Sequence, residues 1–512
     1  MILLSSILIP ALIALIIALI PRSSGRFGSL ASFVALFYSL LIYILAPTVY
    51  GIPYFEKIFS SASIGTFGFF VDSYNIPFLL GISLVSSIVS LYSYPYMEHR
   101  FKELGYGSWR IYYVNYLLFA LSMNGVALST NLIEFYVFLE ISLITSFILI
   151  ALYGYGARIK IGIMYFIWTH VGALLFLLGS LIYGINAGTF DFIYPEKPYY
   201  MIGYGEKILG ILGGIQLSVF LLILIGLMIK LPALGFHIWL PYAHAEAPTP
   251  VSALLSPNLI GLAGLGLVRV LVTLFPQVFH GLQSYLILWA LLTMIYGGLM
   301  ALFQNDYKRF LAYSSISQMG YILLGVATLT PAGLIGAVLH YLTHALGKAA
   351  LFMTAGSIIV SGHGLRDMRK MGGLASTMNY TASSALLGFL TISGLPPTMG
   401  VVSKFFVVSG FAIYLMSRVD NISDLIILII LGFLGFGLTI VYSFATMRKI
   451  FFGQRRSDEE IHEGSPGISL TTLSVALLSI LMLVLIGFIL NSFSYTPELL
   501  YLKIILSLVR GW

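Results

Sequence analysis

Residues 221–241 read LLILIGLMIKLPALGFHIWLP, an apolar stretch that contains one lysine and is interrupted by proline. Lys230 ends the first apolar run, Pro232 follows it, and the residues up to Pro241 stay largely apolar. Proline breaks a helix, and carbonyls freed by a break within a membrane must be satisfied by protein or water. The stretch therefore predicts a membrane helix that is broken beside a lysine, as transporters have at their binding sites. The alternative is a lysine at a helix end whose ammonium reaches the headgroups.

The composition of the 512-residue chain places this stretch in a bilayer. Hydrophobic residues make up 59% of the chain and charged residues 9%, and the mean hydropathy is +0.99. Soluble domains carry about 25% charged residues, so this chain is predicted to be an integral membrane protein. It has no cysteine, which excludes disulfides and iron–sulfur ligation, so any electron transfer requires partner chains. The net charge of +7 comes without basic runs interleaved with aromatic residues, and nucleic acid is therefore not an expected partner.

Fourteen apolar runs are predicted to cross the membrane as helices, because about 20 apolar residues span the hydrocarbon core. The first run is expected to be a retained helix, since no basic residue precedes it and no small-residue cleavage site follows. The many Tyr and Phe residues are expected in interfacial belts and helix packing. The predicted spans are residues 2–20, 28–50, 74–94, 111–129, 132–152, 159–183, 209–230, 249–274, 281–302, 308–328, 332–358, 379–409, 422–446 and 469–492.

The charges in the connecting loops support this number of spans. Loops after odd-numbered spans carry sixteen Lys and Arg residues, whereas loops after even-numbered spans carry four. Because Lys and Arg gather in cytoplasmic loops, the odd loops are predicted to be cytoplasmic and both termini to lie outside the cell. Residues 497–512 are predicted to form a short interfacial helix. The connections are too short to hold a soluble catalytic domain.

Several ionisable residues fall inside the predicted spans, where a charge is costly and usually faces a partner or water. Glu140 lies about two helical turns into its apolar run, and indicates a proton or cation site or, alternatively, a protonated structural carboxyl. His340, His344 and Lys348 recur every four residues and so share one helix face over about 12 Å. No carboxylate or thiolate accompanies them as a metal site would require, and a stripe of exchangeable protons is favoured.

A second break accompanies a second lysine. Lys404 follows residues 393–397, which read SGLPP. Lys230 and Lys404 each lie near the fourth span of a five-span unit, and units with an odd number of spans are inverted relative to each other. The predicted organisation is N-terminal helices in 1–110, a first repeat of spans 4–8 in 111–274, a second repeat of spans 9–13 in 281–446, and the last span with the interfacial helix in 447–512.

Three longer motifs resemble a known family. Residues 230–249 read KLPALGFHIWLPYAHAEAPT, residues 303–320 read FQNDYKRFLAYSSISQMG, and residues 343–352 read THALGKAALF. They are similar to the signatures of the antiporter-like subunits of respiratory complex I, the D-type subunit of Mrp sodium/proton antiporters, and the large membrane subunits of energy-converting hydrogenases. The resemblance covers residues 70–455, and Glu140 falls where the family keeps a glutamate in its fifth helix.

The resemblance implies an all-α membrane fold of fourteen helices with two inverted five-helix repeats and with the seventh and twelfth helices broken. It also implies a hydrated axis at mid-membrane, in which a glutamate and a lysine pair and protons pass between successive groups. The residues matched to this axis are Glu140, Lys230, His340, His344, Lys348 and Lys404. Possible accessory residues are His237, His244, Glu246 and Arg269.

The implied function is translocation of H⁺ or Na⁺ by a subunit of a multisubunit redox complex in the cytoplasmic membrane. The expected partners are other membrane subunits, including small Mrp-like ones, and a peripheral arm. No cofactor is expected in this chain; iron–sulfur clusters, with a Ni–Fe site or a flavin, are expected in the partner subunits.

Two departures from the family pattern leave alternatives open. Many members carry a lysine in helix eight where this chain has Gly261, and some carry a histidine in helix ten where it has Gln318. The predicted axis therefore lacks an ionisable group between its two halves. Lys404 resembles the D-type antiporter pattern, and residues 246–256 are similar to Mrp-like and hydrogenase-linked members. The expected complex is of the membrane-bound hydrogenase type or the NADH:quinone oxidoreductase type. The alternatives are a subunit of a secondary Mrp-type Na⁺/H⁺ antiporter and a membrane scaffold that has lost transport.

Overall fold

Fourteen helices within the described part of the chain are long and apolar enough to cross a membrane. The computed structural model describes residues 1–20, 24–62, 64–193, 212–419, 421–456 and 460–494. Each of the fourteen helices overlaps one predicted span, so the predicted number of spans is confirmed. The predicted interfacial helix at 497–512 lies outside the described residues.

Three of the first six spanning helices begin at an N-capping side chain. Side chains of Ser24, Ser108 and Asn131 accept hydrogen bonds from the first turns of the second, fourth and fifth helices, as N-capping residues do. The six helices are α1 (Ile2–Leu19), α2 (Gly25–Tyr50), α3 (Ile76–Leu104), α4 (Trp109–Leu128), α5 (Leu132–Tyr153) and α6 (Arg158–Ala187).

The remaining spans surround a buried centre. The span Thr249–Val272 and helices α14 and α15 are almost entirely buried, which explains why their sequences are apolar all round. Helix α15 packs against α3, α10, α14, α16, α17 and α19. The elements are α8 (Gln216–Lys230), α9 (Trp239–Glu246), α10 (Thr249–Leu254), α11 (Leu262–Gly266), α12 (Pro276–Gly281), α13 (Gln283–Leu302), α14 (Tyr307–Ala327), α15 (Pro331–Ser361), α16 (Asn379–Ser393), α17 (Gly400–Arg418), α18 (Ile422–Phe451) and α19 (Pro466–Ser494), with π-helical stretches at Leu255–Leu259 and Leu267–Val272.

Two connections without helical structure fall where the sequence predicts breaks. Helix α8 ends at Lys230 and α9 begins at Trp239, and α16 ends at Ser393 and α17 begins at Gly400. Gly394 adopts a φ of +76° at the second break, a conformation that residues with a side chain rarely adopt. The division into inverted repeats stays a prediction.

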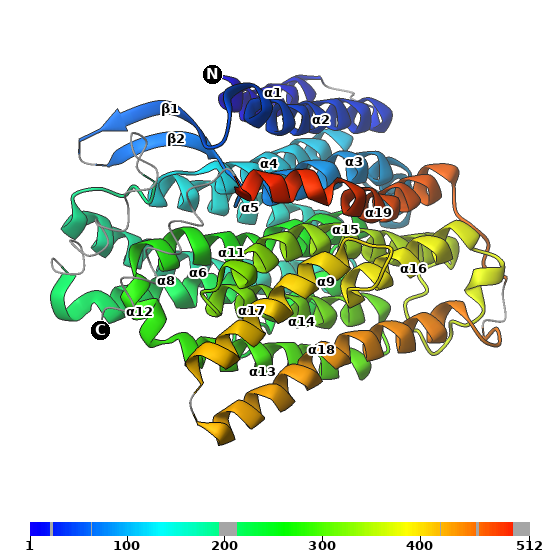
Figure 1. The fold of residues 1–512 in the computed structure, drawn as a ribbon. Coiled ribbons are helices and arrows are strands. Elements are labelled where there is room, and N and C mark those ends of the chain that lie inside the picture. Colours follow the sequence, from blue (N-terminus) through cyan, green and yellow to red (C-terminus); the bar gives the residue numbers. More distant parts are fainter. Residues whose placement is uncertain (21–23, 63, 194–211, 420, 457–459, 495–512) are drawn as a thin grey trace.

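A β-hairpin was not expected from the sequence. Strands β1 (Tyr54–Ser61) and β2 (Gly65–Val71) pair antiparallel between α2 and α3, beside α1 in Figure 1. The two segments are too short to span a membrane, and their aromatic residues suit a half-buried sheet. The protein is therefore mostly helical, as predicted, with one small sheet at an end of the bundle.

The hairpin also holds the first helix. The buried carboxylate of Glu56 on β1 accepts hydrogen bonds from the backbone N–H groups of Leu3, at 2.9 Å, and Leu4, at 3.0 Å. The first N–H groups of a helix have no partner within the helix. The Glu56 carboxylate therefore caps α1, although it lies more than 50 residues away in the sequence.

We expect Glu56→Ala to lower the free energy of unfolding by about 1–2 kcal/mol, because two backbone donors lose their acceptor. Thermal unfolding of the detergent-solubilised protein would measure this. The neighbouring exposed residue provides the control Lys57→Ala, and equal melting temperatures of the two variants would contradict the capping role.

Candidate functional site

The break beside Lys230 is stabilised by indole groups. Trp239 donates to the carbonyl of Ile229 at 3.0 Å, Trp289 to that of Leu234 at 2.9 Å, and Trp168 to that of Phe236 at 3.1 Å. The tryptophans come from α9, α13 and α6. Neutral donors thus satisfy carbonyls that the broken helix would otherwise leave unpaired.

The ammonium of Lys230 is therefore not needed to satisfy the break. The side chain is 3% exposed, and its Nζ has no hydrogen-bond partner among the described residues. Glu140 on α5 interacts with it electrostatically, although the described residues include no ion pair between the two within 4.0 Å. A buried ammonium with no fixed acceptor can exchange its proton with a mobile partner.

The direct partner of Glu140 is a histidine that sequence reasoning missed. Nδ1 of His170 on α6 lies 3.0 Å from Oε2 of Glu140, and the His170 ring stacks on Phe166. The two side chains are 34% and 14% exposed, so the pair lies at the outer face of α5 and α6. His170 is the only histidine in its long apolar run, and nothing in its spacing relates it to Glu140.

The two ends of the predicted stripe on α15 contact different neighbouring helices. Lys348 donates to the Leu311 carbonyl at 3.0 Å and to the hydroxyl of Ser314, both on α14. At the other end, Nδ1 of His340 lies 3.2 Å from the hydroxyl of Ser403 on α17. All three stripe residues are fully buried.

A tyrosine connects the stripe to Lys404. The Nζ of Lys404 lies 4.1 Å from the ring centre of Tyr321, and the His340 ring stacks on the same tyrosine at 5.1 Å. A cation held against an aromatic face away from water gains about 2 kcal/mol. Tyr321 also bonds Thr439 at 2.8 Å, which fixes its ring. Sequence reasoning assigned the tyrosines to interfacial belts and helix packing.

The accessory residues separate in space. The fully buried His244 on α9 stacks on Phe352 of α15, and interacts electrostatically with His344 and Lys348. The other three lie in different contacts. His237 bonds Tyr296 at 3.0 Å, Glu246 interacts electrostatically with Lys308, and Arg269 forms an ion pair with Asp72 beside the hairpin.

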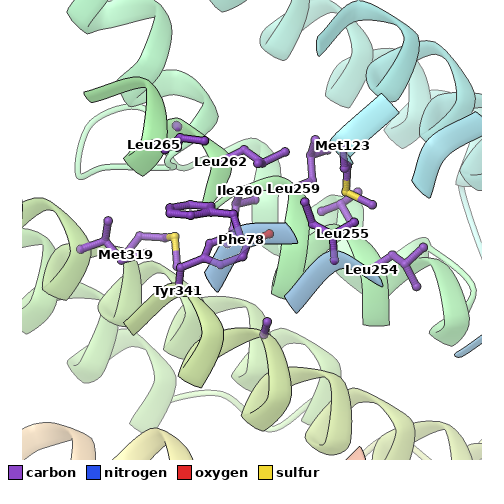
Figure 2. Packing of buried hydrophobic residues seen from close by; sticks show 14 of the residues in the cluster. Phe78, Met123, Leu254, Leu255, Leu259, Ile260, Leu262, Leu265, Met319 and Tyr341 are labelled. Carbon is purple, nitrogen blue, oxygen red and sulfur yellow. The ribbon is translucent and has the colours of Figure 1, made fainter. Parts of the chain in front are cut away.

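Packed side chains occupy the space beside Gly261, the position where many family members have a lysine in helix eight. A Cβ at Gly261 would lie 2.5 Å from the ring of Tyr341. Tyr341 stacks on Phe78 with ring centres 4.0 Å apart and donates to the Asn258 carbonyl at 3.0 Å. Figure 2 shows Phe78, Tyr341 and Ile260 together in this apolar region. The side chains of Phe78, Ile260 and Tyr341 therefore fill the space where many family members have a lysine side chain. We call these three residues, together with Gly261, the Tyr341 plug.

Gln318 stands where some family members have a histidine in helix ten. Its side-chain amide donates a hydrogen bond but accepts none among the described residues. Its amide nitrogen donates to the Tyr442 hydroxyl at 2.6 Å, whereas its buried amide oxygen has no partner within the described ranges. Gln318 therefore offers a polar atom on α14 but no group that titrates.

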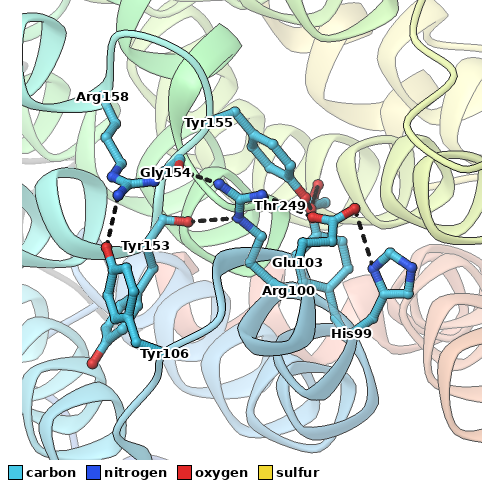
Figure 3. Close-up of polar contacts among 10 residues, drawn as sticks. His99, Arg100, Glu103, Tyr106, Tyr153, Gly154, Tyr155, Arg158 and Thr249 are labelled. Atoms are coloured by element: carbon cyan, nitrogen blue, oxygen red, sulfur yellow. Dashed lines mark hydrogen bonds and ion pairs between the residues drawn. The ribbon is translucent and has the colours of Figure 1, made fainter.

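A polar cluster closes the end of the bundle next to α9 (Figure 3). Arg100 on α3 donates to the carbonyls of Tyr153, at 3.1 Å, and Gly154, and lies 3.8 Å from the ring centre of Tyr155. Burial raises the pKa of Tyr155, so its hydroxyl stays protonated and bonds Tyr96 at 2.7 Å. The cluster joins α3 to the connection between α5 and α6.

Two broken helices, each with a buried lysine, and a stripe of buried histidines define a polytopic membrane protein of the ion-transport type. The chain belongs to the family described as "NADH:quinone oxidoreductase/Mrp antiporter, TM", which matches residues 129–439. The description "NADH-Ubiquinone oxidoreductase (complex I), chain 5 N-terminus" matches residues 61–106. The family predicted from the motifs is therefore confirmed, and the chain is an antiporter-like membrane subunit.

Relatives of three kinds are similar to the chain. "NADH-quinone oxidoreductase subunit M" of Rickettsia felis is 32% identical over 69% of this chain and 67% of its own length. "Hydrogenase-4 component B" of Escherichia coli is 32% identical over 69% of this chain and 52% of its own length. A chain of the Mrp complex from Dietzia sp. shares the fold, with a TM-score of 0.80, 21% identity and 99% of both chains covered.

We expect Trp289→Phe to lower the free energy of unfolding by about 1–3 kcal/mol more than a Trp→Phe change that loses no hydrogen bond, since it leaves the Leu234 carbonyl without its donor. Trp109→Phe is the matched control, because its indole N–H has no hydrogen-bond partner in the described part of the chain. Thermal unfolding in detergent would compare them. If the two variants unfold at the same temperature, the indoles do not stabilise the break.

Proposed function

We propose that this chain moves protons or cations across the cytoplasmic membrane along an axis of its buried ionisable residues. The observation that carries the proposal is the pair of buried lysines, one at each break. The Nζ atoms of Lys230 and Lys404 have no hydrogen-bond partner among the described residues. An unpaired ammonium inside a membrane protein is costly and is kept where it has a function.

In the first half of the axis, Glu140 controls the charge of Lys230. An ionised carboxylate near the ammonium offsets the cost of burying it, and loss of that negative charge favours release of the lysine proton. His170 lies against Glu140 and can hold a proton on its imidazole. Movement of a proton within the Glu140–His170 pair would therefore switch the state of Lys230.

In the second half, protons move between imidazole and amine groups. His344 and His340 each keep a ring nitrogen without a hydrogen-bond partner within the described residues. A neutral imidazole with an unpaired nitrogen can accept a proton and donate another from its opposite side. The stripe would connect Lys348 to Tyr321 and Lys404 in this way.

The two halves are proposed to communicate through His244 rather than through position 261. The Tyr341 plug fills the space beside Gly261, whereas His244 is on α9, the helix that follows the Lys230 break. Both nitrogens of His244 are buried without a partner in the described chain, and its ring lies beside α15. The histidine at the break therefore offers a titratable group where the family pattern has a helix-eight lysine.

The proposed setting is a multisubunit redox complex. Relatives named as subunits of an NADH-quinone oxidoreductase and of a hydrogenase support this choice. We propose that this chain is not an enzyme on its own, and that iron–sulfur clusters with a flavin or a Ni–Fe site lie in partner subunits. We also propose small Mrp-like membrane partners, a peripheral arm and both termini outside the cell.

The Mrp-like fold neighbour favours the second candidate, a subunit of a secondary Na⁺/H⁺ antiporter. Mass spectrometry of the intact purified complex separates the two: iron–sulfur or nickel-bearing partners support the redox complex, and membrane partners alone support the antiporter.

We expect Glu140→Gln and Lys230→Ala to reduce coupled ion movement by at least about tenfold, because each removes a titratable group of the proposed axis and loss of a positioned proton carrier typically costs that much or more. A pH-sensitive dye in inverted vesicles would measure the movement. The exposed residues Glu98 and Lys57 provide the controls Glu98→Gln and Lys57→Ala. Unchanged transport in both axis variants would contradict the proposal and leave the scaffold alternative.

A second test addresses the connection at His244. We expect His244→Phe to reduce transport by about tenfold or more, because loss of a positioned proton carrier typically costs that much or more. The double variant Gly261→Lys/Tyr341→Ala, which makes room for the family lysine, should restore transport in the His244→Phe background. Wild-type transport in His244→Phe would show that protons take another route.

A further inference from the structure

A pocket of about 680 Å³ lies away from the ion axis, at one end of the bundle. Its walls come from residues 303–306, between α13 and α14, and residues 362–370, between α15 and α16. Both segments follow odd-numbered spans, so the pocket lies at the predicted cytoplasmic edge of the membrane.

Backbone hydrogen bonds join the two walls. The Tyr307 N–H donates to the Arg366 carbonyl at 3.0 Å, and the Met368 N–H donates to the Asn305 carbonyl at 2.8 Å. Backbone pairing of this kind holds the pocket in one shape, so its charged side chains keep their relative positions.

The pocket carries an excess of positive charge. Its two carboxylates are each matched by an arginine: Arg366 pairs with Asp306 at 2.8 Å, and Arg369 with Asp367 at 2.7 Å. Hydrogen bonds from Arg369 lower the pKa of Asp367 to about 2, so this pair is formed at physiological pH.

Two cations remain without a carboxylate partner among the described residues. Arg309 lies against the ring of Tyr242, with 5.8 Å to the ring centre, and Lys370 is exposed at the pocket wall. The buried Nε of Arg366 also has no acceptor in the described chain. The pocket therefore presents two cationic donors, Arg309 and Lys370, to a ligand, with a net charge of about +2 by simple counting of its four cations and two carboxylates.

An apolar stripe leads from the hydrophobic part of α13 to this pocket. Leu288, Leu292, Leu299 and Phe303 are exposed and lie four, seven and four residues apart, which places them on one helix face. Phe303, at the pocket rim, is 78% exposed. In a bilayer such a face contacts acyl chains.

We propose that this pocket binds the phosphate of an anionic phospholipid, whose acyl chains lie along the α13 stripe. Arg309 and Lys370 contact the phosphate, since guanidinium and ammonium groups form charge-assisted hydrogen bonds with its oxygens. Basic pockets at the cytoplasmic ends of membrane helices recognise anionic headgroups in this manner. The adjacent apolar stripe favours a lipid over free phosphate, because a soluble anion makes no use of it.

Photo-crosslinking in nanodiscs tests the proposal. The complex containing this chain is placed in phosphatidylcholine with a small fraction of photoactivatable phosphatidylglycerol, and labelled peptides are identified by mass spectrometry. Label is expected at residues 303–309 and 362–370. Arg309→Gln/Lys370→Gln should lower the affinity about 30-fold, since each cation near an anionic headgroup contributes about fivefold.

The charge-conserving double variant Arg309→Lys/Lys370→Arg should keep the label, and so should Lys102→Gln, which removes an exposed cation outside the pocket. Equal labelling of wild type and Arg309→Gln/Lys370→Gln would overturn the proposal. Equal labelling by photoactivatable phosphatidylcholine would overturn the preference for an anion. Displacement of the lipid by inorganic phosphate alone would identify a soluble phosphate site instead.

Discussion

The arrangement of the charged groups depends on how the backbone break beside Lys230 is stabilised. A broken helix inside a membrane exposes carbonyls, and a nearby ammonium would be their natural donor. Here three indole N–H groups from three helices satisfy carbonyls of this break. Neutral indole donors therefore satisfy these carbonyls, and the ammonium of Lys230 is not required as a donor to the backbone. Had Lys230 satisfied the break itself, its deprotonation would have unpaired the backbone.

At the second break, the ammonium of Lys404 also has no hydrogen-bond partner among the described residues, but its surroundings differ. Gly394 lies so close to Lys404 that an added Cβ would be 2.5 Å from its Cδ, and the ammonium rests on the face of Tyr321. An aromatic face stabilises the charged form without accepting a proton. Hydrogen bonds from the break reach α19, where the Met399 N–H donates to the Ser479 carbonyl. In both halves, neutral aromatic side chains stabilise the backbone or the charge near a lysine.

Most of the fold was predictable from the sequence, because long apolar runs and loop charges report membrane helices directly. The breaks were predictable too, since Pro232 and residues 393–397 signal them locally. The hairpin was not, because its stabilising contacts, such as Glu56 with the first turn of α1, join residues about 50 positions apart. His170 and Tyr321 were missed for the same reason: each is ordinary in its own helix and acquires its role from a neighbouring helix.

The sequence indicated a gap at Gly261, and the structure gives its physical cause. Tyr341 and a helix-eight lysine would compete for the same space, because a Cβ at position 261 already meets the tyrosine ring. Tyr341 is also held by its hydrogen bond to the Asn258 carbonyl and by stacking on Phe78. A chain that keeps this tyrosine must connect its two lysines elsewhere if it connects them at all. The proposed connection runs through His244, because the helix that follows the Lys230 break, α9, places this histidine against Phe352 of α15.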